Sequence, residues 1–407
     1  MRISMITELQ RSVSEDGLVD FEATYEESLA QARLADEAGF HTMWITEHHF
    51  LPTFSVAPAS DQFLAAVAAQ TKNIRVGTGV VVLPYHHPLH VAERIAMLDL
   101  ISEGRVEFGT GRGGVYEVTG HSIDPRDTRE MWEESLACIE GIWESYPDEF
   151  SFDGKHWQIP TRVVVPQPVQ KPPRRWLACA QPDSFSVAAD HGMGVLAFVP
   201  SPPSVTKSLV EGYRERIANC DVAPKLRNEN WAAMAFAVCG DDGHEARELV
   251  SKALKVFFGP DRPYNAAASA ITKTLIEEWD GDIPDDLKVH MTKDGETSSI
   301  NAAEVQTGTG LSAAARALKQ DEGLSAAAAA ATDGGEGDAW DRLDAETLAD
   351  SGITVAGNPD QCIECLKLYE ENGVDEVMVL VQNETVSHEV SMETIRQFGE
   401  HVIPAFR

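Results

Sequence analysis

The chain has little cysteine, few basic residues and no long apolar run. It contains 6 cysteines among 407 residues, and 33 lysines and arginines against 65 aspartates and glutamates, which gives a formal net charge of -32. Such an acidic chain repels the phosphates of nucleic acids and of anionic membrane surfaces. No stretch approaches the ~20 apolar residues of a membrane-spanning helix, and the N-terminus lacks a signal-peptide pattern. We therefore expect a cytoplasmic protein with no nucleic-acid or membrane partner.

The cysteines are too sparse for a disulfide-stabilised scaffold. Cys362 and Cys365 form the only Cys-x-x-Cys motif, in a segment that looks like the first turns of a helix. A zinc site would need two further ligands at suitable spacing, and none lies nearby in the sequence. The sequence therefore predicts buried thiols here and no metal site.

Short apolar runs alternate with helical patterns along most of the chain. This alternation predicts parallel strands joined by helices, and a count of eight favours a closed (β/α)8 TIM barrel over an open doubly wound sheet. Helices are predicted over residues 21–38, ending at Gly39, and over 60–70, with Ser60 as N-cap. We predict one barrel domain over residues 1–407, with strands at residues 2–9, 44–50, 74–83, 105–114, 175–180, 195–199, 231–239 and 376–381.

A long insertion, residues 260–350, breaks this alternation after strand seven, where a barrel needs only a short loop. It has a helical pattern near its start, then acidic and alanine-rich stretches with few core-forming residues. One interpretation is a solvated excursion without a role in the chemistry. Because the insertion follows a barrel strand, we expect instead that it emerges at the catalytic face as a lid or flexible flap.

Polar residues gather where the second strand ends. The apolar run that begins at Thr42 ends in Glu47, His48, His49 and Phe50. The carboxyl ends of barrel strands carry the chemistry of this fold. An imidazole titrates near neutrality and can move a proton, although two adjacent histidines on an extended segment point to opposite faces. We expect Glu47 either to orient an imidazole or to pair with a basic residue at the barrel rim.

Strands three, four and five carry a second set of candidates, suited to an anion. Arg112 lies in a glycine-rich loop after strand four, where its guanidinium could bind a phosphate or simply pair with a surface carboxylate. Arg129, near the start of the next helix, is a weaker candidate. Ala180, Gln181 and Ser184 follow strand five and lead into a helix, whose free N–H groups suit an anion.

Five segments in the same order along the chain resemble the bacterial luciferase-like, flavin-dependent monooxygenase family. The resemblance runs from the N-terminus to the eighth strand and fails only in the insertion. The segments are Glu47-His-His-Phe50, residues 76–84 with His87-Pro88, residues 104–113, residues 153–157 with 166–172, and residues 357–364 with 373–377.

This resemblance implies a barrel that binds reduced FMN supplied by a separate flavin reductase. Molecular oxygen would add to the flavin as a C4a-peroxyflavin, which then oxidises a small organic substrate. His48 aligns with the catalytic histidine of the family, and His49 and Glu47 are further catalytic candidates. Glu47 could also orient the edge of the flavin ring. The family has a non-proline cis peptide under the flavin, which predicts a cis bond or bulge at Gly79–Val80.

The resemblance also implies phosphate contact by Arg112 and a homodimer formed through barrel helices. The family often has Ser or Glu where Ala180 and Gln181 stand, so phosphate binding there is expected to be altered. The light-emitting members carry a reactive cysteine where this chain has Gly111, and a different ring-bearing segment where it has residues 257–261. Light emission and a long-chain aldehyde substrate are therefore not expected.

Two alternatives remain open. The same fold could use the deazaflavin F420 for hydride transfer, but that cofactor has a long acidic tail, which this acidic chain does not favour. The chain could also be a non-catalytic flavin-binding subunit. His48 argues against that interpretation, because a silent subunit has no need of a base.

Overall fold

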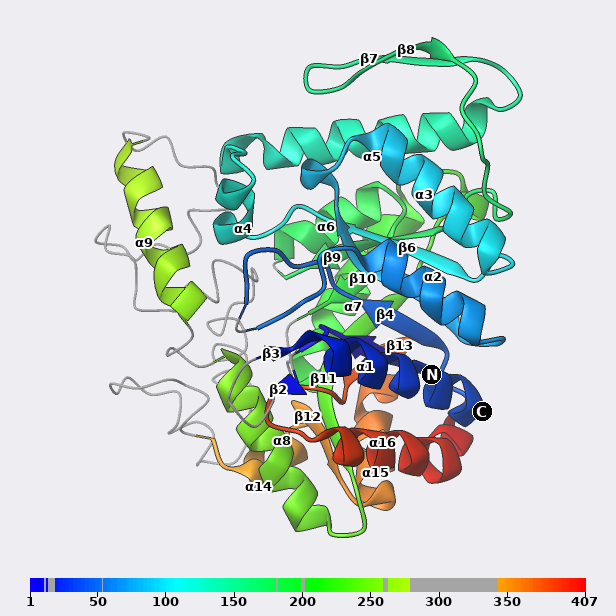
Figure 1. Ribbon diagram of the computed structural model, residues 1–407. Coiled ribbons are helices and arrows are strands. Elements are labelled where there is room, and N and C mark those ends of the chain that lie inside the picture. The colour runs from blue at the N-terminus through cyan, green and yellow to red at the C-terminus, as the bar shows by residue number, and fades with distance from the viewer. Residues whose placement is uncertain are drawn as a thin grey trace.

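The computed structural model describes residues 1–10, 12–13, 19–52, 54–180, 182–198, 202–258, 263–278 and 343–407. Eight parallel strands form a closed ring in the order β10-β9-β6-β5-β4-β1-β13-β11, and pairing between β10 and β11 closes it (Figure 1). The predicted TIM barrel is therefore confirmed. The strands are β1 (Arg2–Thr7), β4 (Thr42–Ile45), β5 (Arg75–Val82), β6 (Val106–Gly111), β9 (Arg174–Cys179), β10 (Gly194–Ala197), β11 (Trp231–Cys239) and β13 (Glu376–Leu380).

The barrel strands are nearly continuous apolar runs because both of their faces are covered. Every residue of β4, β6, β10, β11 and β13 is buried, as expected for parallel strands enclosed by helices. Inside the ring, the Trp44 and Trp176 rings meet edge to face with centroids 5.4 Å apart. Their indole N–H groups donate to the buried carboxylates of Glu376 and Glu107. The interior is therefore a packed core, not a pore.

Helices surround the ring, and their ends follow the capping residues of the sequence. In α1, Asp20 accepts a hydrogen bond from the Ala23 N–H, and Gly39 ends the helix with a positive φ of 87°, as predicted. The N-cap of α2 is Ala59, so the prediction of Ser60 as N-cap is wrong by one residue. The larger helices are α1 (Phe21–Ala38), α2 (Ser60–Gln70), α3 (Pro88–Ile101), α5 (Thr128–Ser145), α6 (Pro182–Asp190), α7 (Pro203–Ala218), α8 (Gly243–Phe258), α15 (Pro359–Glu371) and α16 (His388–Gln397).

Several short elements were not predicted. They are β2 (Ser12–Val13), β3 (Val19–Asp20), α4 (Val115–Gly120), the hairpin of β7 (Phe150–Asp153) and β8 (Gln158–Arg162), and β12 (Thr354–Gly357). β12 pairs with the second half of β11. Phe236 of β11 pairs with β13 on one side, so β12 lies on the other, beyond the end of β10. No strand was predicted at residues 354–357, although β4 and β10, which are equally short, were predicted.

The second barrel strand ends earlier than predicted, and this matters for function. β4 stops at Ile45, whereas the sequence predicted a strand as far as Phe50. After Thr46 donates to Thr7 O of β1, the chain leaves the sheet, and His48 N–H donates to Ala57 O instead. Glu47, His48 and His49 therefore lie in a loop at the carboxyl end of the barrel, so the alternation of a strand does not fix their side-chain directions.

The predicted cis bond or bulge at Gly79–Val80 is confirmed. The Gly79–Val80 peptide bond is cis, and the β5–β6 register shifts between Thr78 and Val81. At this break the Thr78 hydroxyl forms hydrogen bonds with the Gly109 backbone in place of the regular backbone pairing between β5 and β6. Its Oγ1 donates to Gly109 O at 2.8 Å and accepts from Gly109 N–H at 2.9 Å.

We expect Gly109→Ala to destabilise the barrel at this break. A Cβ atom at position 109 would lie 2.1 Å from the backbone oxygen of Thr78 and 2.9 Å from Leu196 Cδ1. Backbone must shift to admit it, so the free energy of unfolding should fall by about 1–3 kcal/mol in urea denaturation. Gly212→Ala is the matched control, because nothing lies within 4 Å of a Cβ there. In the middle of α7 it should raise stability by about 0.5–1 kcal/mol. Equal effects of the two changes would contradict this account.

Two further predictions can be compared with the fold. Cys362 and Cys365 are free thiols on the buried side of α15, as predicted. Most of the insertion, residues 279–342, lies outside the described residues, which include α9 (Pro263–Glu278) at its start and α14 (Ala345–Asp350) at its end. α9 contacts α4, and both lie at the same end of the barrel in Figure 1.

Among the described residues, no helix combines the length and the apolar character needed to cross a membrane.

Candidate functional site

Ionisable side chains from four barrel units meet at the carboxyl end of the ring. Glu8 follows β1, residues 47–49 follow β4, His86 follows β5, and Glu117 belongs to α4 after β6. All three glutamates are buried, with at most 5% of their surface exposed. Buried carboxylates are costly unless positive charges or hydrogen-bond donors compensate them. The histidines of this loop supply that compensation.

His48 lies between two carboxylates. Its Nε2 is 3.2 Å from Glu8 Oε2, and its Nδ1 is 3.3 Å from Glu117 Oε2. Burial by itself lowers the pKa of His48, but the charges and hydrogen bonds of Glu117 and Glu8 outweigh it and raise the pKa to about 10. The sequence analysis expected an imidazole that titrates near neutrality, and the structure corrects this. At neutral pH His48 is an imidazolium that can donate a proton.

Glu47 holds a second pair of rings. Its Oε1 lies 2.6 Å from His86 Nε2 and 3.1 Å from His49 Nε2, while its Oε2 accepts from Val82 N–H at 3.0 Å. Burial by itself raises the pKa of Glu47, but the hydrogen bonds from His49, His86 and Val82 lower it to about 2. Of the two interpretations of Glu47, orientation of an imidazole is the one that the structure supports.

Glu117 also fixes the relation between the two adjacent histidines. One of its oxygens contacts His48 Nδ1, and the other accepts from the backbone N–H of His49 at 2.5 Å. His48 thus has its own carboxylate pair, Glu8 and Glu117, while the His49 ring contacts Glu47. The two rings contact different carboxylates, in line with the expectation that they point in different directions. A loop, and not the predicted strand, sets these directions.

Aromatic side chains wall the site. The His48 ring meets Phe54 edge to face at 5.3 Å, and Tyr85 stacks on His121 at 4.2 Å. Tyr85 Oη is buried and has no hydrogen-bond partner among the described residues. Phe50 is 51% exposed at this end of the barrel. These rings place apolar and aromatic surface beside the charged groups.

Sequence reasoning missed five residues of the site. Glu8 had a usable signal, since it directly follows the first strand. Tyr85 and His86 lie between the two parts of one segment that carries the family resemblance, residues 76–84 and His87-Pro88, but they were not singled out. Glu117 and His121 belong to α4 and the residue that ends it, and that six-residue helix was not predicted. The missed residues are Glu8, Tyr85, His86, Glu117 and His121.

The predicted anion-binding residues lie along the neighbouring strands β6 and β9. Thr110 pairs with Leu177, so Arg112 and Cys179 are each two residues beyond a paired position, and the Arg112 charge acts on the Cys179 thiol. Ala180 N–H donates to Ser184 Oγ at 3.2 Å, at the start of α6. The structure therefore brings Arg112, Ala180 and Ser184 to one region of the mouth. Gln181 lies outside the described residues.

Arg129 is in a different setting. It lies in the first turn of α5, with 54% of its side chain exposed, and its Nε is 3.4 Å from Glu133 Oε1. An exposed pair of this kind contributes at most about 1 kcal/mol, so it would not prevent Arg129 from binding another anion. Phosphate binding by Arg129 stays a prediction.

The pKa of His48 predicts a pH dependence of stability. The folded-state pKa of about 10 exceeds the ordinary value of 6.5 for histidine, so the folded protein holds this proton more tightly than the unfolded chain. The resulting stabilisation is complete below pH 6.5 and is lost as the pH rises towards 10. We expect a loss on the order of 3 kcal/mol over this window. Urea denaturation at pH 6.5, 8 and 10 should show it as a difference between the native chain and His48→Gln; parallel curves would contradict it.

Comparison with known proteins agrees with the fold. The chain matches the model of the luciferase-like monooxygenase family over residues 1–376. It is 33% identical over 199 residues to the oxygenase component of a flavin-dependent trigonelline monooxygenase from Acinetobacter baylyi, a match that covers 48% of this chain and 53% of that relative. It is 33% identical over 181 residues to limonene 1,2-monooxygenase from Rhodococcus erythropolis, covering 44% and 46%. The chain spans about half the length of these curated relatives.

Solved structures share the whole architecture. A monooxygenase from Streptomyces bottropensis, RslO1, has a TM-score of 0.71 with 23% identity and full coverage of both chains. The oxygenating constituent of 3,6-diketocamphane monooxygenase from Pseudomonas putida, in complex with FMN, has a TM-score of 0.69 with 20% identity, covering 99% of this chain and 98% of that chain. At these identities the likeness establishes the fold alone. Together with the family match across residues 1–376, it leads to one conclusion: this chain belongs to the luciferase-like monooxygenase family.

Proposed function

We propose that this protein is a monooxygenase that uses reduced FMN and O2 to oxidise a small organic substrate. The observation that carries the proposal is the His48 ring, held between the carboxylates of Glu8 and Glu117 at the carboxyl end of the barrel. A relative is named an oxygenase component, and a structural neighbour holds FMN. By analogy, a separate flavin reductase supplies the reduced cofactor, and the enzyme works in the cytoplasm.

The residues at the mouth fit FMN. A Cβ atom at Gly111 would lie 2.7 Å from Val80 Cγ2 and 3.6 Å from Ala178 Cβ, so the lack of a side chain at Gly111 lets the half-buried Val80 lie against β6 beside the Gly79–Val80 bond. Arg112 at one side of this surface would hold the phosphate, together with backbone N–H groups near Ala180 and Ser184. When bound, reduced FMN supplies the electrons that activate O2.

The chain's own groups manage protons and exclude water. Glu8 and Glu117 keep His48 protonated at neutral pH, so His48 can donate its proton to an oxygen that gains negative charge. Glu47 orients His49 beside it. Phe50, Phe54 and the Tyr85–His121 stack surround the reacting groups with rings and limit the access of water.

Oxygen labelling tests the proposed reaction. The purified protein is supplied with FMN, NADH, a flavin reductase and 18O2, and a panel of small terpenes, ketones and N-heterocycles is screened by mass spectrometry. We expect one 18O atom in the product and none from labelled water. Oxidation of an alcohol with reduction of F420, and without use of O2, would instead identify the F420-dependent alternative, a chemistry named for a neighbour with a TM-score of 0.65 and 15% identity. Flavin binding without turnover of any compound would favour a non-catalytic subunit.

We also propose a homodimer formed through barrel helices. Met97, Leu100 and Ile101 lie on α3 and are each 46–52% exposed. Val169 continues this apolar surface, because a Cβ at Gly104, just beyond α3, would lie 3.6 Å from it. Contiguous exposed apolar side chains commonly mark a protein interface. Light scattering should give twice the chain mass, and Leu100→Glu should convert the dimer to a monomer.

The start of the insertion supports a lid. Phe257, near the end of α8, packs on Phe54 with ring centroids 5.1 Å apart, and Phe54 packs on His48. α9 then contacts α4, which carries Glu117. The insertion therefore begins beside the residues at the mouth. We propose that residues 260–350 cover the site when substrate is bound.

A further inference from the structure

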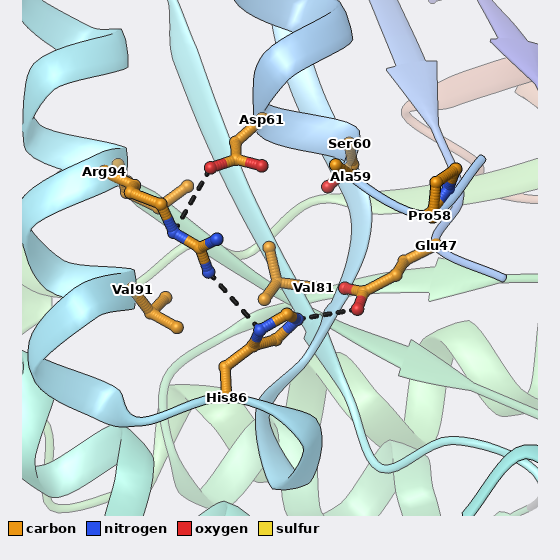
Figure 2. A pocket seen from close by; sticks show the side chains of 10 residues that line it. Glu47, Pro58, Ala59, Ser60, Asp61, Val81, His86, Val91 and Arg94 are labelled. Atoms are coloured by element: carbon orange, nitrogen blue, oxygen red, sulfur yellow. Dashed lines mark hydrogen bonds and ion pairs between the residues drawn. The ribbon is translucent and has the colours of Figure 1, made fainter. Parts of the chain in front are cut away.

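A second line of polar residues leads away from the mouth behind Glu47. His86 Nε2 lies 2.6 Å from Glu47 Oε1, and the other ring nitrogen, Nδ1, lies 3.4 Å from Arg94 Nη2. Arg94 Nε is in turn 3.2 Å from Asp61 Oδ2. Figure 2 shows this chain of contacts from the loop after β4, through His86, to α3 and α2. It joins the buried site to the outer helices.

Exposure rises from Glu47 to Arg94 and falls again at Asp61. The Glu47 side chain is 2% exposed, His86 is 21% exposed, Arg94 is 37% exposed and Asp61 is 14% exposed. The residues enclose a cavity of about 20 Å³, lined by polar groups of Glu47, Ser60, Asp61, His86 and Arg94. That space is enough for one water molecule, which would find several polar partners there. The network is therefore anchored at its solvent end by a guanidinium and at its buried end by a carboxylate.

The chemistry of Arg94 determines which nitrogen of His86 carries hydrogen. A guanidinium has only N–H donors and keeps its proton at all ordinary pH values. His86 Nδ1 must then accept from Arg94, and in the neutral ring the hydrogen lies on Nε2, directed at Glu47. The same reasoning applies to His49, whose Nε2 faces the ionised Glu47 and must donate to it.

We propose that His86, supported by Arg94 and Asp61, is a positioning residue that divides the roles of the two adjacent histidines. His86 holds Glu47 in place, and Glu47 holds His49 as the Nε2–H tautomer. His49 Nδ1 is then left as the nitrogen that accepts a proton, next to the His48 imidazolium that donates one. Two imidazoles at neighbouring positions thus act as acid and base because different carboxylates face them. The catalytic part of this inference rests on the proposed function, whereas the tautomer part does not.

Nitrogen-15 NMR of histidine-labelled, cofactor-free protein tests the tautomers directly. Ring nitrogens with and without hydrogen have separate resonances, assigned with His49→Gln and His86→Gln. At pH 7.5 we expect both rings to carry hydrogen on Nε2. His86→Leu should leave His49 as a mixture of tautomers, whereas His86→Gln should preserve the native signal, because its amide can donate to Glu47 and its oxygen can accept from Arg94. An unchanged His49 signal in His86→Leu, or a native His86 ring with hydrogen on Nδ1, overturns the proposal.

Two further variants keep the test decisive. Arg94→Met leaves His86 in place but removes the donor to Nδ1, so the His86 signal should become mixed even if His86→Leu fails to fold. His90→Leu, on the exposed face of α3, should change neither signal. With an active preparation, we expect His86→Leu to lower kcat on the order of tenfold with KM little changed, and His86→Gln to restore most of it. If no oxygenation is found at all, the tautomer measurements still decide the structural part of the proposal.

Discussion

The His48→Ala variant is expected to lose about 10²- to 10⁴-fold in kcat while still binding FMN. A positioned acid contributes rate enhancement of this size because it transfers its proton as charge develops. The pKa of about 10 means that the native imidazole carries this proton at neutral pH, and the His48 ring is the group that contacts both Glu8 and Glu117. Steady-state kinetics, with FMN affinity measured by quenching of flavin fluorescence, would check both parts.

The control for this variant must separate lost chemistry from lost folding. Removing His48 leaves two buried carboxylates without their cation, which is destabilising. His48→Gln keeps a hydrogen-bond donor to one carboxylate but cannot act as an acid, so it should be better folded than His48→Ala and equally impaired. Native turnover in either variant would contradict the role assigned to His48. Loss of FMN binding in parallel with turnover would show that His48 acts in binding instead.

The second large effect is expected for Arg112→Ala, which should weaken FMN binding by about 10- to 100-fold. A charge-assisted hydrogen bond contributes roughly 1.5–3 kcal/mol, and each 1.4 kcal/mol corresponds to a factor of ten in affinity. Arg112 is half-buried just beyond the end of β6, beside the end of β9. Equilibrium titration of oxidised and photoreduced FMN would measure the change.

Riboflavin supplies the sharpest control for Arg112, because it has the flavin ring without the phosphate. Its affinity should be the same in the native protein and in Arg112→Ala. An equal loss of FMN and riboflavin binding would mean that Arg112 supports the fold of the mouth and does not bind phosphate. Arg129→Ala serves as the matched arginine variant, and the exposed position of Arg129 beside Glu133 leads us to expect less than a twofold effect.

The fold could be predicted from sequence because its signal is local and repeated. Each barrel strand is a short apolar run between turn residues, and eight such runs alternating with helices leave few topologies. The same local signal failed at β12, which has only four residues, and at β4, whose last predicted residues leave the sheet to form the loop of Glu47, His48 and His49. Strand length is decided by hydrogen bonding to neighbours that are distant in sequence.

The candidate site was predicted in part. His48, His49 and Glu47 could be found because polar residues at the end of an apolar strand are unusual, and the Gly79–Val80 cis bond followed from the family resemblance. Their partners could not be found in this way. His48 meets Glu117 across 69 positions of the chain, and His86 meets Glu47 across 39. Hydrophobic periodicity reports only on neighbouring residues, so it could not predict contacts between residues this far apart in the sequence.

The sequence by itself determined which chemical groups stand at the ends of the strands: two imidazoles, their neighbouring carboxylate, a glycine-flanked arginine and an interrupted third strand. Only the tertiary structure decided the charge that these groups carry. Glu8 and Glu117 approach His48 from two different barrel units and make it a cation, whereas Glu47 and His86 surround His49. The physical reason is that a pKa depends on burial and on the distance to other charges, and the closure of the barrel sets both.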